Sequence, residues 1–251
     1  MILHRHLPWI YSQNLQTAND CWVLPPEEAR HITRVRRFQS EEAAVAFDGK
    51  GYMRIGRLHL EKQQTLLRFT EPLQQAPTLP ITFQLILCLP NHVATFEEIL
   101  RKMCELGIQT LLPIYAQHTE KLHWTRKVWE QRSPRWRRIL IEACKQAKNP
   151  LLPKIFPPCK IQQLSPIAVG FCIHGSLTAS TLSQPFLPSP KEKIYSAIVG
   201  CEGGFSEEEE AFLDKISQKI CLPTSVLRIE TAAVSLLTLL KAKTFRPSCR
   251  W

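Results

Sequence analysis

The sequence predicts two domains: a small β-rich domain at residues 1–72, followed by a larger α/β domain at residues 73–251 with a mostly parallel sheet. The chain has 251 residues, of which 44% are hydrophobic, and this is enough for two cores. Residues 71–80, EPLQQAPTLP, carry three prolines and no helical or strand period, so they mark the boundary. Beyond them, apolar strand-like runs alternate with amphipathic helical patterns, as in a sheet covered on both faces.

The first domain is predicted from the segment AAVAFDGKGYMRIGRLHL, in which an Asp48-Gly49 turn joins two strand-like runs. LLRFT adds a third strand. Before them, PPEEARHITRVRRF begins with two prolines and two acids and ends with cations, which predicts a short helix. Its cationic end, with His31, Arg34, Arg36 and Arg37, is either a solvated helix end or a contact for phosphate.

The second domain is predicted to begin with the strand ITFQLILCL and the helix TFEEILRKMCELG. Thr95 is the expected N-cap of that helix, Glu98 completes a capping box and Gly107 ends it. The strand TLLPIY follows. The next helix, SPRWRRILIEACKQAK, has Pro134 in its first turn. Its apolar stripe is Trp136, Ile139, Leu140, Ala143 and Ala147, and its other face carries Arg135, Arg138 and Lys145.

The rest of the second domain continues the alternation. PIAVGFCIHG and YSAIVG are apolar and strand-like, and an acidic helix follows in which Ser206 and Glu209 form a capping box. Next come CLPTSVL and a final helix, ETAAVSLLTLLKAK. We expect Glu207 to Glu210 to complement the helix dipole and face water.

Charge and cysteine usage indicate the class of protein. There are 32 Lys and Arg against 22 Asp and Glu, a net charge of +10, so a polyanion such as nucleic acid is the expected partner. Nine cysteines form no Cys-x-x-Cys pair, which indicates reduced thiols. The N-terminal residues lack the apolar core of a signal peptide, and no run reaches the roughly 18 apolar residues of a membrane span. We therefore expect a cytoplasmic protein without membrane contact.

The candidate site lies where strands of a parallel sheet end, because ligands bind there. Three such ends are chemically unusual: residues 173–176, 200–204 and 227–232. Glu202 stands between glycines and is not needed to cap a helix, so we expect it to hold a backbone group or a cation. The loop lacks the phosphate-binding glycine motifs and is itself anionic, which favours a neutral or cationic ligand.

These segments carry a resemblance to a known family. GCEGGFSEEE and VLRIETA resemble the GPEGG and LRTETA motifs of the ribosomal RNA uridine-N3 methyltransferases of the SPOUT superfamily. Upstream, MCELGIQTLLPIYAQHTEK and RWRRILIEACKQAKNPLLPKI are also similar to segments of that family, as are HITRVRR and DGKG. The resemblance covers essentially the whole chain. It departs at four positions: Cys201 replaces proline, Ile229 replaces threonine, His118 replaces arginine, and Asn149 stands in a segment where arginine is expected.

The resemblance implies a trefoil-knotted methyltransferase domain preceded by a PUA-like RNA-binding barrel, and a homodimer with the active site at the subunit interface. It implies S-adenosylmethionine as cofactor and N3 of a uracil in 16S rRNA of the small ribosomal subunit as acceptor. Arg228 is the implied catalytic residue. The implied cofactor-binding residues are His174, Gly175, Gly200, Glu202, Gly203, Gly204, Leu222, Leu227, Arg228, Glu230 and Thr231.

Basic residues in both domains are the expected phosphate contacts. They are Arg34, Arg36 and Arg37 in the first domain and Arg132, Arg135, Arg137 and Arg138 in the second. No metal is expected, since His4 and His6 have no carboxylate or cysteine close in sequence. Two alternatives remain open: a ribose 2′-O methyltransferase of the same superfamily, and a ribosome-binding factor that has lost catalysis.

Overall fold

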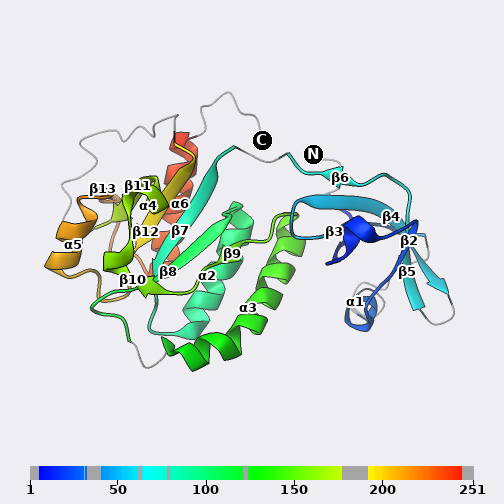
Figure 1. The fold of residues 1–251 in the computed structure, drawn as a ribbon, viewed down its shortest axis with the longest axis horizontal. Helices are drawn as coiled ribbons and strands as arrows, with labels where there is room; N and C mark the ends of the chain where they lie inside the picture. The colour runs from blue at the N-terminus through cyan, green and yellow to red at the C-terminus, as the bar shows by residue number, and fades with distance from the viewer. Residues whose placement is uncertain are drawn as a thin grey trace. The chain divides into compact units, whose positions relative to one another are not determined.

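The computed structural model describes residues 6–30, 32, 41–61, 64–77, 80–120, 124–176 and 192–244. The chain folds as two units, drawn in Figure 1. The first comprises Met1–Thr78 together with Ile141–Leu152, and the second comprises Leu79–Leu140 and Pro153–Trp251. The first unit therefore includes a segment from the middle of the chain, which the sequence did not indicate.

The first unit is built on a six-stranded sheet with the order β1-β3-β4-β5-β2, in which β6 also pairs with β4. As predicted, Asp48-Gly49 joins two antiparallel strands, β3 and β4, and LLRF lies in the next strand, β5. The elements are β1 (Trp9–Tyr11), η1 (Leu15–Thr17), β2 (Cys21–Val23), α1 (Pro26–Arg30), β3 (Ala43–Phe47), β4 (Tyr52–Glu61), β5 (Gln64–Phe69) and β6 (Gln74–Gln75). The short strand β6 lies in the segment predicted to be an unstructured linker.

The segment Ile141–Leu152 is bound to the first unit by backbone and charge. The N–H of Leu152 donates to the carbonyl of Gly49 at 2.8 Å, and the N–H of Gly51 donates to that of Pro150 at 3.1 Å. Lys145 was predicted on a polar helix face, but it is buried and its ammonium lies 2.6 Å from the carboxylate of Glu28. The interior of the unit is apolar, with Ile10, Leu15, Leu58 and Leu67 almost fully buried.

The second unit contains a seven-stranded sheet of order β10-β8-β7-β12-β11-β13, with β9 also paired to β8, and every pairing is parallel. This confirms the predicted parallel sheet. Its strands are β7 (Thr82–Cys88), β8 (Thr110–Tyr115), β9 (Lys154–Ile155), β10 (Cys159–Lys160), β11 (Phe171–Gly175), β12 (Ile194–Val199) and β13 (Gln218–Ile220). The helices are α2 (Val93–Leu106), α3 (Arg126–Ala147), η4 (Ile161–Gln163), α4 (Pro166–Val169), α5 (Glu207–Leu213) and α6 (Ile229–Thr244).

The sheet of the second unit is covered on both faces. Helix α6 packs against β7, β11 and β12 and also against α2. On the sheet, α5, η4 and α4 contribute side chains to a buried apolar cluster. Leu213 of α5 lies in this cluster together with Ile86 of β7 and Ile198 of β12. Since the central strands are buried on both sides, their sequences are continuous apolar runs rather than alternating ones.

Several predicted element boundaries are wrong, and each has a local cause. Helix α2 begins at Val93 with His92 as N-cap, so Thr95 lies inside the first turn and its N–H bonds to His92. Gly107 ends the helix at φ 63°, as predicted. The segment PIAV forms helix α4 instead of a strand, because Ser165 caps it and Pro166 occupies its first position. Strand β13 comes before CLPTSVL, which forms a loop.

Helix α3 begins at Arg126, well before the predicted start, so Pro134 lies in its interior. A proline there removes the N–H that would bond to the carbonyl four residues earlier, which is that of Glu130. The hydroxyl of Ser133 donates to this carbonyl at 3.1 Å and so replaces the missing donor. The sequence Ser-Pro therefore continues a helix that a proline usually interrupts.

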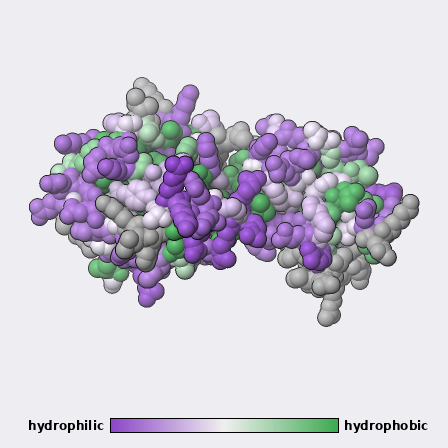
Figure 2. Space-filling model, turned by 60° about the horizontal axis from the view of Figure 1, so that its bottom comes forward, coloured by the Kyte–Doolittle hydropathy of each residue, from purple (hydrophilic) through white to green (hydrophobic). Residues whose placement is uncertain are grey.

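Much of the surface seen in Figure 2 is hydrophilic, with apolar residues in smaller areas. Among the described residues, the large apolar side chains classed as exposed are Val23, Leu60, Leu73 and Val226. No helix among the described residues has both the length and the hydrophobicity that spanning a membrane requires.

Candidate active site

Three neighbouring strands of the second unit, β12, β11 and β13, carry the predicted cofactor residues at their ends. Because the strands are parallel, their carboxyl ends lie at one edge of the sheet. The loops that leave this edge are residues 200–205 after β12, the segment that begins at Ser176 after β11, and residues 221–228 after β13. Segments far apart in sequence thus meet where a ligand of an open α/β sheet binds.

The glycine loop, residues 200–205, needs glycine at two positions. A Cβ on Gly203 would lie 2.9 Å from the Cβ of His118, which is closer than such atoms approach. Gly204 has a φ of 70°, a conformation that costs other residues free energy, and the space beside it is open. The loop can therefore present backbone to a ligand without side chains in between.

Glu202 binds a backbone group, as the sequence predicted. Both of its carboxylate oxygens accept from the N–H of Asn91, at 3.1 and 3.2 Å. Asn91 follows β7, which pairs with β12. Glu202 therefore ties the glycine loop to the loop after the neighbouring strand. The predicted alternative partner, Arg228, makes no ion pair with it among the described residues.

Two of the departures from the family pattern, Cys201 and His118, lie against the same loop. The Sγ of Cys201 is 3.5 Å from the carbonyl oxygen of Gly204, and the Nδ1 of His118 is 3.4 Å from the same atom. The thiol of Cys88, at the end of β7, donates to the Cys201 sulfur and is the main cause that lowers the pKa of Cys201 to about 7. The pairing raises the pKa of Cys88 far above its ordinary value.

The acids of α5 do more than face water. Ser206 accepts from the N–H of Glu209 at 3.3 Å, and Glu209 accepts from the N–H of Ser206 at 3.0 Å, which confirms the capping box. The other oxygen of Glu209 accepts from the N–H of Gln117 at 2.7 Å, and this side chain is buried. The prediction that all four acids face water is therefore wrong for Glu209, and Glu210 is also partly buried.

The last loop carries Leu222 and Leu227, both half-buried, and ends at Arg228, whose side chain is exposed. Within the described residues the Arg228 guanidinium has no carboxylate partner, so it can face a ligand. Glu230 and Thr231 were predicted to lie in this loop, but they belong to the first turn of α6, which begins at Ile229.

The side chain of His174 is directed away from the loops. It is fully buried beneath α5, where its Nδ1 lies 2.8 Å from the hydroxyl of Ser217. Burial lowers the pKa of His174, against the opposing effect of Glu210 and Asp214. Any contact of His174 with a ligand in the loops would therefore come from its backbone.

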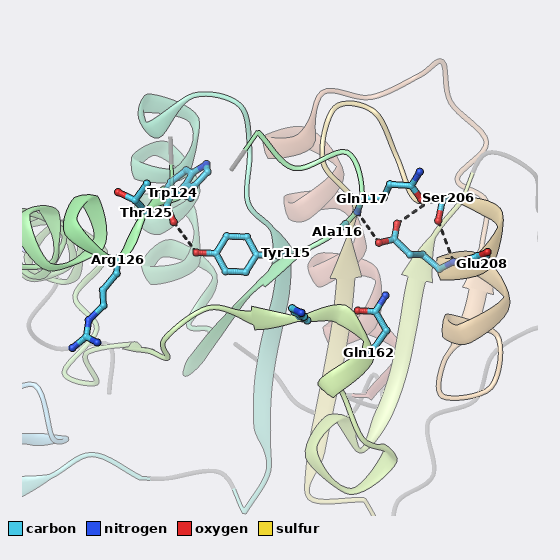
Figure 3. Close-up of a pocket in the computed structure, with 11 residues that line it drawn as sticks. Tyr115, Ala116, Gln117, Trp124, Thr125, Arg126, Gln162, Ser206 and Glu208 are labelled. Atoms are coloured by element: carbon cyan, nitrogen blue, oxygen red, sulfur yellow. Dashed lines mark hydrogen bonds between the residues drawn. The ribbon is translucent and has the colours of Figure 1, made fainter. Parts of the chain in front are cut away.

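A cavity that the sequence did not indicate lies beside the glycine loop (Figure 3). It has a volume of about 520 Å³ and opens beyond the ends of β8 and β10. Its wall is ordered by hydrogen bonds: the Tyr115 hydroxyl donates to the carbonyl of Trp124 at 2.7 Å, and Trp124 donates to that of Pro90 at 2.6 Å. The lining residues are Tyr115, Ala116, Gln117, Trp124, Thr125, Arg126, Lys160, Gln162, Ser206, Glu208 and Glu209.

The predicted RNA contacts differ in how available they are. Arg135 donates to both oxygens of the buried Glu97, at 2.7 and 2.9 Å, and Arg132 lies 4.0 Å from the same carboxylate. Arg138 is exposed. Arg34, Arg36 and Arg37 lie outside the described residues.

Comparison with known proteins gives consistent matches. The family model described as RNA methyltransferase domain matches residues 77–241. The chain is 31% identical over 221 residues to ribosomal RNA small subunit methyltransferase E of Aquifex aeolicus, covering 87% of this chain and 93% of the relative. It is 24% identical over 256 residues to the protein of the same name from Buchnera aphidicola, covering 96% and 95%.

Solved structures agree with the sequence relatives. Ribosomal RNA small subunit methyltransferase E from Neisseria gonorrhoeae, crystallised with S-adenosyl methionine bound, superposes with a TM-score of 0.76 at 25% identity, covering 94% of this chain and 97% of that one. A putative methyltransferase from Legionella pneumophila has the same fold, with a TM-score of 0.77 at 22% identity, covering 94% and 98%.

Proposed function

Because this chain belongs to the family of ribosomal RNA small subunit methyltransferase E, we propose that it transfers a methyl group from S-adenosylmethionine to N3 of a uracil in 16S rRNA. The observation that carries the proposal is the meeting of three loops at the ends of β12, β11 and β13. The segments GCEGG after β12 and LRIETA after β13 match the family's GPEGG and LRTETA motifs, apart from the substitutions at Cys201 and Ile229.

The residues at this edge fit the proposed cofactor. Open space beside Gly204 admits a ligand close to the backbone, and Leu222 and Leu227 offer apolar contact for an adenine. The loop carries Glu202 and no cation, which suits a sulfonium better than a phosphate. When bound, S-adenosylmethionine supplies an electrophilic methyl group.

Methylation at N3 places two demands on the protein. N3 lies on the Watson–Crick edge, so the target base must be unpaired or flipped out. The imide must also lose its proton, so negative charge develops on the ring, and a nearby cation stabilises it. Arg228 suits this role because its exposed guanidinium ends the last loop and has no carboxylate partner among the described residues. The cavity next to the loop is large enough for a nucleotide, and Arg126 and Lys160 in its lining suit phosphates.

The remaining architecture is proposed on the same basis. We propose that residues 1–72 form a PUA-like RNA-binding domain and residues 73–251 a trefoil-knotted domain of the SPOUT superfamily. The strand orders and the parallel sheet support this assignment. A homodimer acting in the cytoplasm on the small ribosomal subunit completes the proposal.

The proposed function is tested with labelled S-adenosylmethionine and small subunits that lack the modification. We expect one N3-methyluridine in 16S rRNA, located by mass mapping of nuclease fragments. A methyl group on a ribose would support the 2′-O alternative. Tight binding to subunits without transfer would instead indicate a factor that has lost catalysis.

The role of Arg228 is tested in the same assay. Arg228→Ala is expected to lower turnover by about 100-fold or more, because a charge that stabilises the transition state is removed, while the melting temperature and RNA affinity stay nearly unchanged. Arg228→Lys should recover part of the loss. Lys193→Ala serves as a control for the loss of one exposed cation, and equal turnover in the two alanine variants would remove Arg228 from the mechanism.

A further inference from the structure

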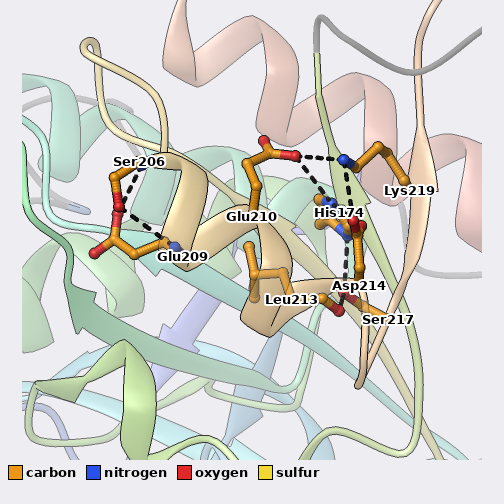
Figure 4. A network of polar contacts seen from close by, with 8 residues as sticks. All are labelled: His174, Ser206, Glu209, Glu210, Leu213, Asp214, Ser217 and Lys219. Carbon is orange, nitrogen blue, oxygen red and sulfur yellow. Dashed lines mark hydrogen bonds and ion pairs between the residues drawn. The ribbon is translucent and has the colours of Figure 1, made fainter.

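A second polar cluster lies beneath the sheet edge, apart from the loops proposed to bind the cofactor (Figure 4). His174 of β11 points toward Glu210 of α5 and toward Asp214, the C-cap residue that follows this helix. Lys219 of β13 completes the group. The Nε2 atom of His174 is 3.6 Å from Asp214 Oδ1 and 3.8 Å from Glu210 Oε2. One nitrogen and two carboxylate oxygens lie within 4.8 Å of one another.

Hydrogen bonding fixes the tautomer of His174. The hydroxyl of Ser217 donates its one proton to the carbonyl of Leu213, at 2.7 Å. The same oxygen is 2.8 Å from His174 Nδ1, so it must accept there, and Nδ1 carries the proton. In the neutral ring, Nε2 is therefore an unprotonated acceptor. It is buried, has no hydrogen-bond partner and faces two carboxylates.

In this arrangement, the lone pairs of His174 Nε2 and of the Glu210 and Asp214 carboxylate oxygens lie close together. A buried acceptor without a donor destabilises the folded state, and neighbouring carboxylates increase that cost. Lys219 compensates only part of the charge: its ammonium is 2.8 Å from Glu210 and 3.2 Å from Asp214. With a neutral imidazole, the two acids and one lysine leave a net charge of −1, and Nε2 remains unpaired.

We propose that His174, Glu210 and Asp214 form a binding site for a divalent transition metal ion, with Zn²⁺ as the best-fitting ion. One imidazole nitrogen and two carboxylate oxygens are a donor set that zinc accepts, and water can complete the coordination. The bond from Nδ1 to Ser217 orients the ring as the second shell of a metal-bound histidine does. Burial favours the neutral imidazole, which is the form that binds metal.

The route to the site is open from one side. Asp214 is 48% exposed, while His174 is fully buried, so an ion can enter from the side of Asp214. Lys219 competes with the ion for both carboxylates. Its side chain is 26% exposed and can turn into solvent, so the metal displaces it at a cost in affinity. This competition predicts that removing the lysine charge tightens binding.

The absence of metal expected from the sequence was based on His4 and His6. The proposed ligands are 36 and 40 residues apart in the chain, and the fold alone brings them together. Because of where these ligands lie, a bound ion would also stabilise the elements that support the loops at the sheet edge. β11, α5 and β13 each adjoin one of the three loops at the sheet edge, so a bound ion would join all three supports. The metal proposal does not depend on the proposed function.

The test uses the full chain, freed of metal by a chelator and then dialysed. Zinc titration by calorimetry and cobalt substitution followed by visible absorption should show one site, with cobalt bands typical of mixed nitrogen and oxygen ligands. His174→Asn and Asp214→Asn should each weaken zinc binding at least about tenfold. Lys219→Met should tighten it. Glu208→Gln, an exposed acid on the same helix, is the matched control and should leave it unchanged.

Several outcomes would overturn the proposal. They are unchanged zinc affinity in both ligand variants, or no binding up to roughly millimolar zinc by the wild type and by Lys219→Met. A third is a nitrogen NMR spectrum that shows His174 doubly protonated at neutral pH, since a proton would then neutralise the carboxylates. If His174→Asn fails to fold, Asp214→Asn decides, because that side chain is partly exposed. Methyl transfer is measured separately, so its failure leaves the metal result intact.

Discussion

At the scale of single residues, Cys201 shows how a substitution in a motif can acquire its own chemistry. Proline occupies this position in the family pattern and has neither a thiol nor an N–H. Here the sulfur lies in a buried cluster with Cys88, whose thiol stabilises the Cys201 thiolate by donating to it. The N–H of Gly203 acts in the same sense. The glycine loop therefore holds a group that ionises near neutral pH.

The ionisation of Cys201 predicts a dependence of stability on pH. Its pKa is lowered from 9 to about 7 in the folded chain, so the folded state gains stability that is complete above pH 9 and is lost as pH falls through 7. The contribution is at most about 3 kcal/mol. Urea unfolding between these pH values should show it in the wild type and not in Cys201→Ala. Thiolate absorbance should titrate near pH 7, and Cys88→Ala should raise that midpoint; an unchanged midpoint would contradict the pairing.

At the scale of elements, the contact between α2 and α3 gives different roles to Arg135 and Arg138, two arginines on α3 that the sequence does not distinguish. Arg135 holds Glu97, which is buried, and lowers the pKa of that carboxyl through two hydrogen bonds. Arg135→Ala should reduce the free energy of unfolding, because a buried carboxylate loses its main partner. Arg138→Ala should change it by less than about 0.5 kcal/mol.

RNA binding by the same two variants tests the distinction. We expect Arg138→Ala to weaken binding to small-subunit RNA in filter assays, since its charge is exposed. Arg135→Ala should act mainly through stability, so its effect on binding should be small at temperatures where the variant is fully folded. If Arg135→Ala lost more RNA affinity than Arg138→Ala at such a temperature, the distinction would be wrong. Arg135 would then bind RNA despite its hydrogen bonds to Glu97.

Element types could be predicted from the sequence better than element ends. The continuous apolar runs of β7 and β12 have one physical interpretation, a strand buried on both faces, and they were identified. The start of α3 was missed because Pro134 suggests a first turn, and only the structure shows Ser133 satisfying the freed carbonyl. The site followed the same rule. Motifs indicated the three loops, whereas the Glu209 bond to Gln117 joins residues 92 apart and has no local signal.

At the scale of the whole molecule, the net charge of +10 predicts salt-sensitive binding to RNA. The logarithm of the binding constant should fall linearly with the logarithm of salt concentration, by roughly 0.7 to 0.9 per phosphate contacted. Replacing Arg34, Arg36 and Arg37 together by alanine should lower this slope by about 2 if all three contact phosphates. Replacing the exposed Lys127, Lys193 and Lys215 removes the same charge and should change the slope less. Equal slopes in the two variants would reject the arginine assignment.

The inclusion of Ile141–Leu152 in the first unit also has a consequence for synthesis. The amino-terminal unit cannot close when its own 78 residues have left the ribosome, because Gly49 and Gly51 lack their partners until Pro150 and Leu152 emerge. At a synthesis rate of about 5 to 20 residues per second, the β3–β4 turn has left the ribosome for several seconds before its hydrogen-bond partners are synthesised. During this time the incomplete unit exposes surface to which chaperones can bind. The duration of this stage is set by the position of Ile141–Leu152 in the chain.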